Sequence, residues 1–109
     1  MSRAAIEREL PTGARCALGD FDRGPLLVAV ERGAIVKQGG RIVHLKPDAK
    51  SLQQLLRGGR FVSDELVVSV DREHQVERID KVTKWQATLR IERGRLRFTS
   101  FHERWSCGV

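Results

Sequence analysis

Basic side chains with the spacing of a phosphate-binding surface are concentrated in residues 84–101. From Trp85 to Ile91 every odd position is apolar, and the even positions between them are polar. Strict alternation of this kind predicts a β-strand with one apolar and one polar face. After Arg93-Gly94 the alternation resumes with the opposite parity, which predicts a second strand and a two-residue turn at this dipeptide. The segment is therefore expected to form a β-hairpin.

A turn at Arg93-Gly94 determines which residues of the two strands lie opposite each other. Apolar residues would face apolar residues, with Leu89 opposite Phe98, and Arg90 would lie opposite Arg97. Two like charges placed directly opposite each other cost some stability. This register therefore points to a partner that neutralises the arginines.

The polar face of the hairpin carries the candidate binding residues. Residues 84–104 hold six basic and two acidic side chains, a balance of +4, in a chain of net charge +6. Arginine guanidinium groups bind phosphate oxygens, and an exposed aromatic ring can stack a nucleobase. We therefore expect a nucleic-acid-binding or anion-binding surface, formed by Lys84, Arg90, Arg93, Arg95, Arg97 and Phe101.

An ordinary solvated face is the alternative explanation for the same charges. Residues 60–83 hold four basic and six acidic side chains, a balance of −2. If these acids lie on the neighbouring strand, they neutralise the hairpin and leave nothing for a polyanion to bind. The sequence alone leaves both explanations open.

Other parts of the chain lack the spacing of a catalytic or metal site. The three histidines have neither HxH nor i,i+4 spacing, and no cysteine joins them at the spacing of zinc ligands. The glycine pairs at 39–40 and 58–59 match neither a P-loop nor a GxGxxG motif. We therefore expect a non-enzymatic binding module with no catalytic residue, no metal and no cofactor.

The two cysteines, Cys16 and Cys107, lie far apart and lack CxxC spacing. The segment 1–7 lacks the long apolar stretch of a secretory signal, so we expect a cytoplasmic protein with two free thiols. No apolar run approaches the ~20 residues that a membrane-spanning helix needs. A membrane partner is therefore not expected.

Trp105 stands in an otherwise polar tail, residues 102–109. A tryptophan in such a tail docks either on its own domain or on a partner. This supports a second hypothesis, a protein-interaction or homo-oligomerising module that buries Trp105 or an exposed strand edge. The expected partners are thus a nucleic acid, an acidic protein or a second copy of the chain.

The remaining pattern predicts short strands and two helices in one domain, residues 1–109. Ser2 can cap a helix over 3–10 that Pro11 closes, and Asp48 can cap a helix over 49–57. Strands are predicted at 14–18, 26–31, 34–38, 42–46, 65–70 and, after a turn at 72–74, at 75–83 with a bulge. We expect an α+β domain, a mainly antiparallel, strongly curved sheet or half-barrel of about six to eight short strands, with mobile ends at 1–12 and 102–109.

Overall fold

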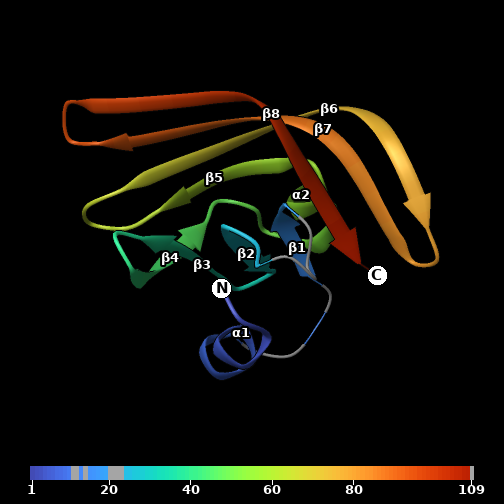
Figure 1. The fold of residues 1–109 in the computed structure, drawn as a ribbon, viewed down its shortest axis with the longest axis horizontal. Helices are drawn as coiled ribbons and strands as arrows, with labels where there is room; N and C mark the ends of the chain where they lie inside the picture. Colours follow the sequence, from blue (N-terminus) through green and yellow to red (C-terminus); the bar gives the residue numbers. More distant parts are fainter. Residues whose placement is uncertain (11–12, 14, 20–23, 109) are drawn as a thin grey trace.

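Eight antiparallel strands, paired in chain order, form a closed barrel with two short helices against it (Figure 1). The computed structural model describes residues 1–10, 13, 15–19 and 24–108. The strands are β1 (Arg15–Leu18), β2 (Leu27–Val30), β3 (Gly33–Gln38), β4 (Arg41–Pro47), β5 (Gly58–Val62), β6 (Val67–Ile79), β7 (Val82–Arg93) and β8 (Leu96–Gly108); the helices are α1 (Arg3–Glu9) and α2 (Leu52–Leu56). The expected antiparallel, curved sheet is present, and it closes into a full barrel instead of a half-barrel.

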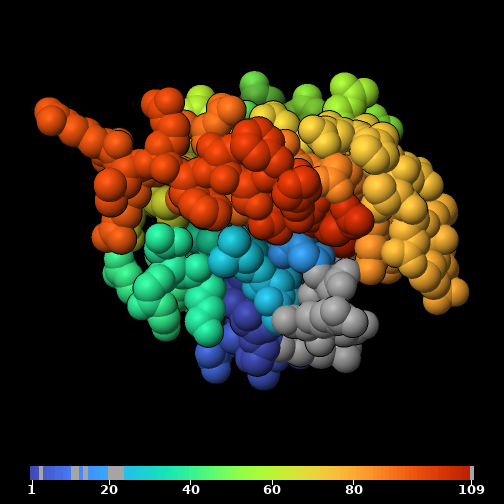
Figure 2. All heavy atoms as spheres, turned by 45° about the horizontal axis from the view of Figure 1, so that its top comes forward, coloured from blue at the N-terminus to red at the C-terminus, as the bar shows by residue number. Residues whose placement is uncertain are grey.

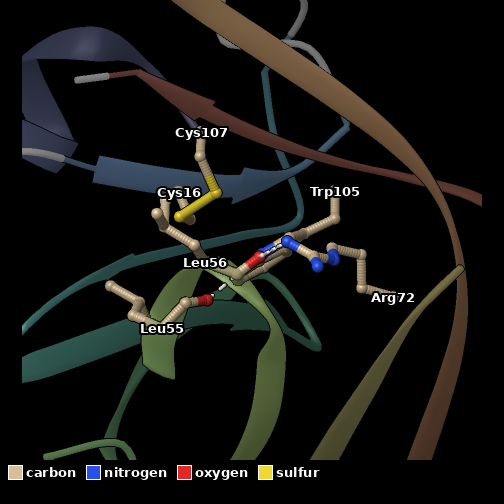
Figure 3. The surroundings of a disulfide bond; sticks show 6 residues. All are labelled: Cys16, Leu55, Leu56, Arg72, Trp105 and Cys107. Carbon is tan, nitrogen blue, oxygen red and sulfur yellow. Dashed lines mark hydrogen bonds between the residues drawn. A yellow bond between two sulfur atoms is a disulfide. The ribbon is translucent and has the colours of Figure 1, made fainter. Parts of the chain in front are cut away.

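The barrel closes where β1 pairs with β8. Cys16 lies opposite Cys107 in this pairing, and the two form a disulfide (Figure 3). Both cysteines are buried. The prediction of two free thiols is wrong, because the seam of the barrel brings together cysteines that are 91 residues apart in the sequence. Disulfides persist mainly in oxidising compartments and are rare in the cytosol. The cytoplasmic location expected from the sequence therefore stays a prediction.

The barrel interior is filled by one apolar cluster that includes Leu55 of α2. The rings of Phe61 and Trp105 meet inside it, with centroids 6.0 Å apart. Figure 3 shows two side chains that fasten the end of α2: the Trp105 indole donates to the Leu55 carbonyl at 3.3 Å, and the Arg72 guanidinium donates to the Leu56 carbonyl at 3.2 Å. The last carbonyls of a helix lack partners within the helix, so these two bonds fix α2 against the barrel.

Trp105 is a core residue, with none of its surface exposed. Of the two alternatives predicted for Trp105, the structure shows docking on its own domain rather than on a partner, and residues 102–108 belong to β8 instead of a tail. Trp85, on the neighbouring strand, is half-buried and packs against the same cluster, as predicted. The Arg72 guanidinium lies 4.6 Å from the centre of the Trp85 ring, a cation–π contact.

Helix α1 covers the outer face of β1, β2 and β3. Ile6 of this helix and Leu10, its C-cap, pack there in a second buried cluster that includes Val28 and Ile35. The hydroxyl of Ser2 accepts a hydrogen bond from the Ala5 amide, as expected of an N-cap. The predicted helix is thus confirmed over Arg3–Glu9, while Pro11 lies outside the described residues. These three strands are consequently buried on both faces.

Helix α2 is shorter than predicted. It begins at Leu52, and Ser51 rather than Asp48 is its N-cap, with the Ser51 hydroxyl accepting from the Gln54 amide at 3.2 Å. Asp48 instead accepts a hydrogen bond from the Arg60 amide at 3.1 Å. The carboxylate therefore joins the end of β4 to β5.

The turn predicted at 72–74 is wrong, because β6 continues through it to Ile79. The pairing of β6 with β7 shifts register twice, between Arg72 and Gln75 and between Gln75 and Glu77, and the second shift lies within the range predicted to contain a bulge. The chain reverses instead at residues 80–81, where Asp80 has φ +55°. Three long strands, β6, β7 and β8, thus sweep across the top of the barrel in Figure 1.

Candidate nucleic-acid interface

The hairpin predicted at 84–101 is formed by β7 and β8, but its turn is Gly94-Arg95. Gly94 has φ +61°, and Arg95 is not among the residues with positive φ. Glycine at the first position of a two-residue loop is typical of a type II′ turn, which matches the twist of the two strands. The predicted turn at Arg93-Gly94 is therefore wrong by one residue.

The new turn shifts the register of β8 by two residues. Arg90 now lies opposite Thr99, and Arg97 lies opposite Glu92, so the predicted pair of opposed arginines is wrong. A shift of two keeps the side chains of β8 up to Ser100 on their predicted faces, because side chains alternate with a period of two. The apolar face of β7 is accordingly confirmed, with Ala87 and Leu89 buried.

Phe101 lies in a bulge of β8 that leaves its side chain exposed. Leu89 pairs with Ser100 and Ala87 pairs with Glu103, so Phe101 and His102 both fall opposite the single residue between them on β7. The Phe101 side chain is 64% exposed, and the exposed His102 lies beside it.

The side chain of Gln86 holds this bulge in place with two hydrogen bonds. Its amide nitrogen donates to the Phe101 carbonyl at 2.8 Å, and its amide oxygen accepts from the guanidinium of Arg104. Arg104 was absent from the predicted site, because the shifted register and the bulge together place it opposite Gln86. The structure therefore adds an exposed cation next to Phe101.

Three of the predicted cations, Arg90, Arg95 and Arg97, are exposed. Within the described part of the chain, none of the three forms an ion pair shorter than 4.0 Å. Arg90 and Arg97 occupy neighbouring positions on the outer face of the hairpin, and Arg95 stands in its turn. The hairpin end, orange in Figure 2, projects from the body of the molecule.

The acids of residues 64–80 neutralise the other two cations in part. Glu65 binds Arg41 with both carboxylate oxygens at 3.0 Å and lies 3.7 Å from Arg93. Lys84 is half-buried at the far end of β7, where Glu77 of β6 lies opposite it. Thus the structure brings the four arginines and Phe101 into one half of the hairpin and places Lys84 apart from them.

Other polar clusters are sparse in the described part of the chain. Among its residues there is no group of three or more His, Cys, Asp and Glu side chains that could hold a metal ion. His44 contacts Glu9, with 2.8 Å between Nε2 and Oε2, which ties α1 to β4. None of the described helices is long and apolar enough to cross a membrane.

Comparisons of the chain with protein-family models, with curated protein sequences and with solved structures give no significant match. A functional proposal for this chain therefore rests on the chemistry of the hairpin surface.

Proposed function

We propose that the protein is a non-enzymatic binding module that holds a single-stranded nucleic acid on the outer face of the β7–β8 hairpin. The observation that carries the proposal is the set Arg90, Arg95 and Arg97, three exposed guanidinium groups without an ion pair to any described acid, beside the exposed ring of Phe101. Guanidinium groups supply paired donors for phosphate oxygens. An aromatic ring among them favours unpaired bases, which can stack on it.

The sheet beneath this face is suited to hold the groups in place. β7 is paired along its whole length, with β6 on one side and β8 on the other. The hydrogen bonds of Gln86 fix the bulge that carries Phe101. Binding would therefore cost little ordering of the backbone, which is the advantage of a site built on a rigid element.

The variant Arg90→Gln/Arg95→Gln/Arg97→Gln should bind a labelled single-stranded oligonucleotide at least about 10-fold more weakly than the wild type at about 50 mM salt. The slope of log affinity against log salt should fall by about 2, because each phosphate contact to a single strand contributes about 0.7. Fluorescence anisotropy across a salt series measures both quantities. In the same titration, Phe101→Ala should weaken binding of the single strand more than binding of a duplex.

A matched control removes the same charge elsewhere. Arg32, Arg57 and Arg60 are exposed and lie outside the hairpin, so their combined replacement by glutamine lowers the net charge equally. This control should keep most of the affinity. An equal loss in both triple variants, or no binding by the wild type at low salt, would contradict the proposal.

Self-association through a strand edge is a second candidate function. β1 pairs with β8 only from Trp105 onward, so the edge of β8 over residues 96–103 has no neighbouring strand among the described elements. An unpaired edge can accept a strand from a second copy. In that case sedimentation velocity should show the sedimentation coefficient rising with protein concentration. A coefficient that stays at the monomer value over a hundredfold range of concentration would exclude this function.

A further inference from the structure

Two exposed large apolar side chains of the hairpin lie on the face opposite to Arg90 and Phe101. Leu96 is 74% exposed and Phe98 is 58% exposed. In the register they lie opposite Arg93 and Ile91, on the side that faces inward farther along the barrel. Water-exposed leucine and phenylalanine side chains on one projecting tip suggest an apolar contact that is made outside the chain.

A shallow groove accompanies these side chains. It holds about 220 Å³ and is lined by Gln38, Ile91, Arg93, Leu96, Arg97 and Phe98. Its lining thus combines three apolar side chains with two arginines. The tip at this end of the molecule projects freely in Figure 2. A ligand for this surface must therefore offer apolar groups and negative charge together, over an area that a projecting tip can reach.

We propose that the β7–β8 tip docks on an anionic lipid surface. Leu96 and Phe98 enter the boundary between headgroups and acyl chains, and Arg95 and Arg97 contact lipid phosphates. In a bilayer with acidic lipids, negatively charged headgroups lie directly outside the apolar acyl chains. One surface therefore provides both the apolar and the charged contacts that the tip needs. This binding needs no membrane-spanning segment, whereas the lack of such a segment was the reason for expecting no membrane partner. Arg95 and Arg97 also belong to the proposed nucleic-acid site, so Leu96 and Phe98 are the residues that distinguish lipid docking from nucleic-acid binding.

A second copy of the chain fits this tip less well. Two tips that meet face to face would bring Arg93, Arg95 and Arg97 of both copies together, and like charges across an interface oppose association. An anionic lipid surface instead attracts the same arginines. The charge of the tip therefore favours lipid as the occupant.

The opposite hairpin, between β6 and β7, provides a control within the same molecule. Val76 and Ile79 are 40% and 57% exposed there, so this tip also offers apolar side chains. Its acids Glu77 and Asp80 are balanced by Arg78 and Lys81, so this tip has no net positive charge to attract an anionic surface. Of the two hairpin tips, only the β7–β8 tip therefore combines exposed apolar side chains with a net positive charge.

The test measures co-sedimentation with vesicles of phosphatidylcholine, with and without one third phosphatidylglycerol. The wild type should bind the anionic vesicles and bind the neutral ones far less. The variant Leu96→Ser/Phe98→Ser should bind the anionic vesicles about 10- to 100-fold more weakly. This is the change expected if the two side chains together bury as much apolar surface in the lipid as one fully buried large side chain. The control Val76→Ser/Ile79→Ser should bind as the wild type does.

A second measurement on the same variants separates this proposal from the nucleic-acid site. Leu96→Ser/Phe98→Ser changes exposed side chains, so its thermal unfolding midpoint should stay close to that of the wild type, and its affinity for the oligonucleotide should be unchanged. Three outcomes would overturn lipid docking: no binding of the wild type to anionic vesicles at low salt, full binding by Leu96→Ser/Phe98→Ser, or an equal loss in the control. Lipid binding that persists when oligonucleotide binding fails would support this proposal alone.

Discussion

The double variant Cys16→Ala/Cys107→Ala is expected to lose about 4–5 kcal/mol of unfolding free energy relative to the oxidised wild type. The disulfide joins residues 91 positions apart, so it restricts a long loop of the unfolded chain. The entropy that a cross-link removes from the unfolded state increases with the logarithm of loop length. Domains of this size have about 5–15 kcal/mol of stability in total, so the variant would lose about a third to nearly all of it.

Urea unfolding followed by tryptophan fluorescence measures this difference, because Trp85 and Trp105 both lie in or against the core. Alanine is preferred to serine, since both cysteines are buried and a hydroxyl group there would lack a partner. The internal control is the wild type unfolded, reduced and refolded in reductant, which should match the double variant. If the oxidised wild type and the double variant share one midpoint, the disulfide does not stabilise the barrel.

The disulfide illustrates what the sequence could not reveal. Cys16 and Cys107 lie in segments with no shared motif, and they meet only because β1 and β8 are the two strands that close the barrel. Alternating residues predict strands, yet alternation does not say whether a curved sheet closes or which strands meet when it does. The pairing of the two cysteines thus follows from barrel closure, and it cannot be predicted without the order of the strands.

The hairpin shows a different limit of sequence patterns. Its strands and faces were predictable, because alternation fixes which residues share a face. Its register was not, because a slip of two residues leaves each side chain on the same face of the sheet. The information lay in the turn: Gly94 fits the first position of a type II′ loop, with Arg95 second.

Trp105 was misplaced because the bulge reverses the parity of β8. Before the bulge the even residues Leu96 and Phe98 lie on the side that faces the barrel; after it the odd residues Trp105 and Cys107 do. A single inserted residue moves every later side chain to the other face. An alternating pattern that is extended past the bulge therefore assigns the later buried side chains to the outer face.

The candidate site was predictable as a group of residues but not as a set of available charges. The arginines of residues 90–97 stand out by composition alone. Which of them keeps an ion pair depends on the loop between β5 and β6, where Glu65 reaches both Arg41 and Arg93. Contacts between residues so far apart in sequence follow from the barrel and leave no local pattern.

Gly58→Ala is expected to cost about 2–5 kcal/mol of unfolding free energy. About 1–2 kcal/mol comes from forcing alanine into left-handed backbone, and about 1–3 kcal/mol comes from overpacking. Gly58 has φ +90°, and a Cβ atom there would lie 2.3 Å from the Val70 carbonyl oxygen of β6. Neither strand can move aside freely, because Gly58 is paired with Asp71 at the point where α2 leads into β5.

Gly39→Ala is the matched control for this prediction. Gly39 also has positive φ, +58°, but a Cβ atom there meets nothing within 4 Å. It should therefore lose only the conformational part, about 1–2 kcal/mol. Urea unfolding of both variants separates the two contributions, since the difference between their unfolding free energies reports the contact with the Val70 carbonyl. Equal losses in the two variants would show that β5 and β6 separate enough to admit a methyl group, and the close approach of the strands at Gly58 would then contribute nothing to stability.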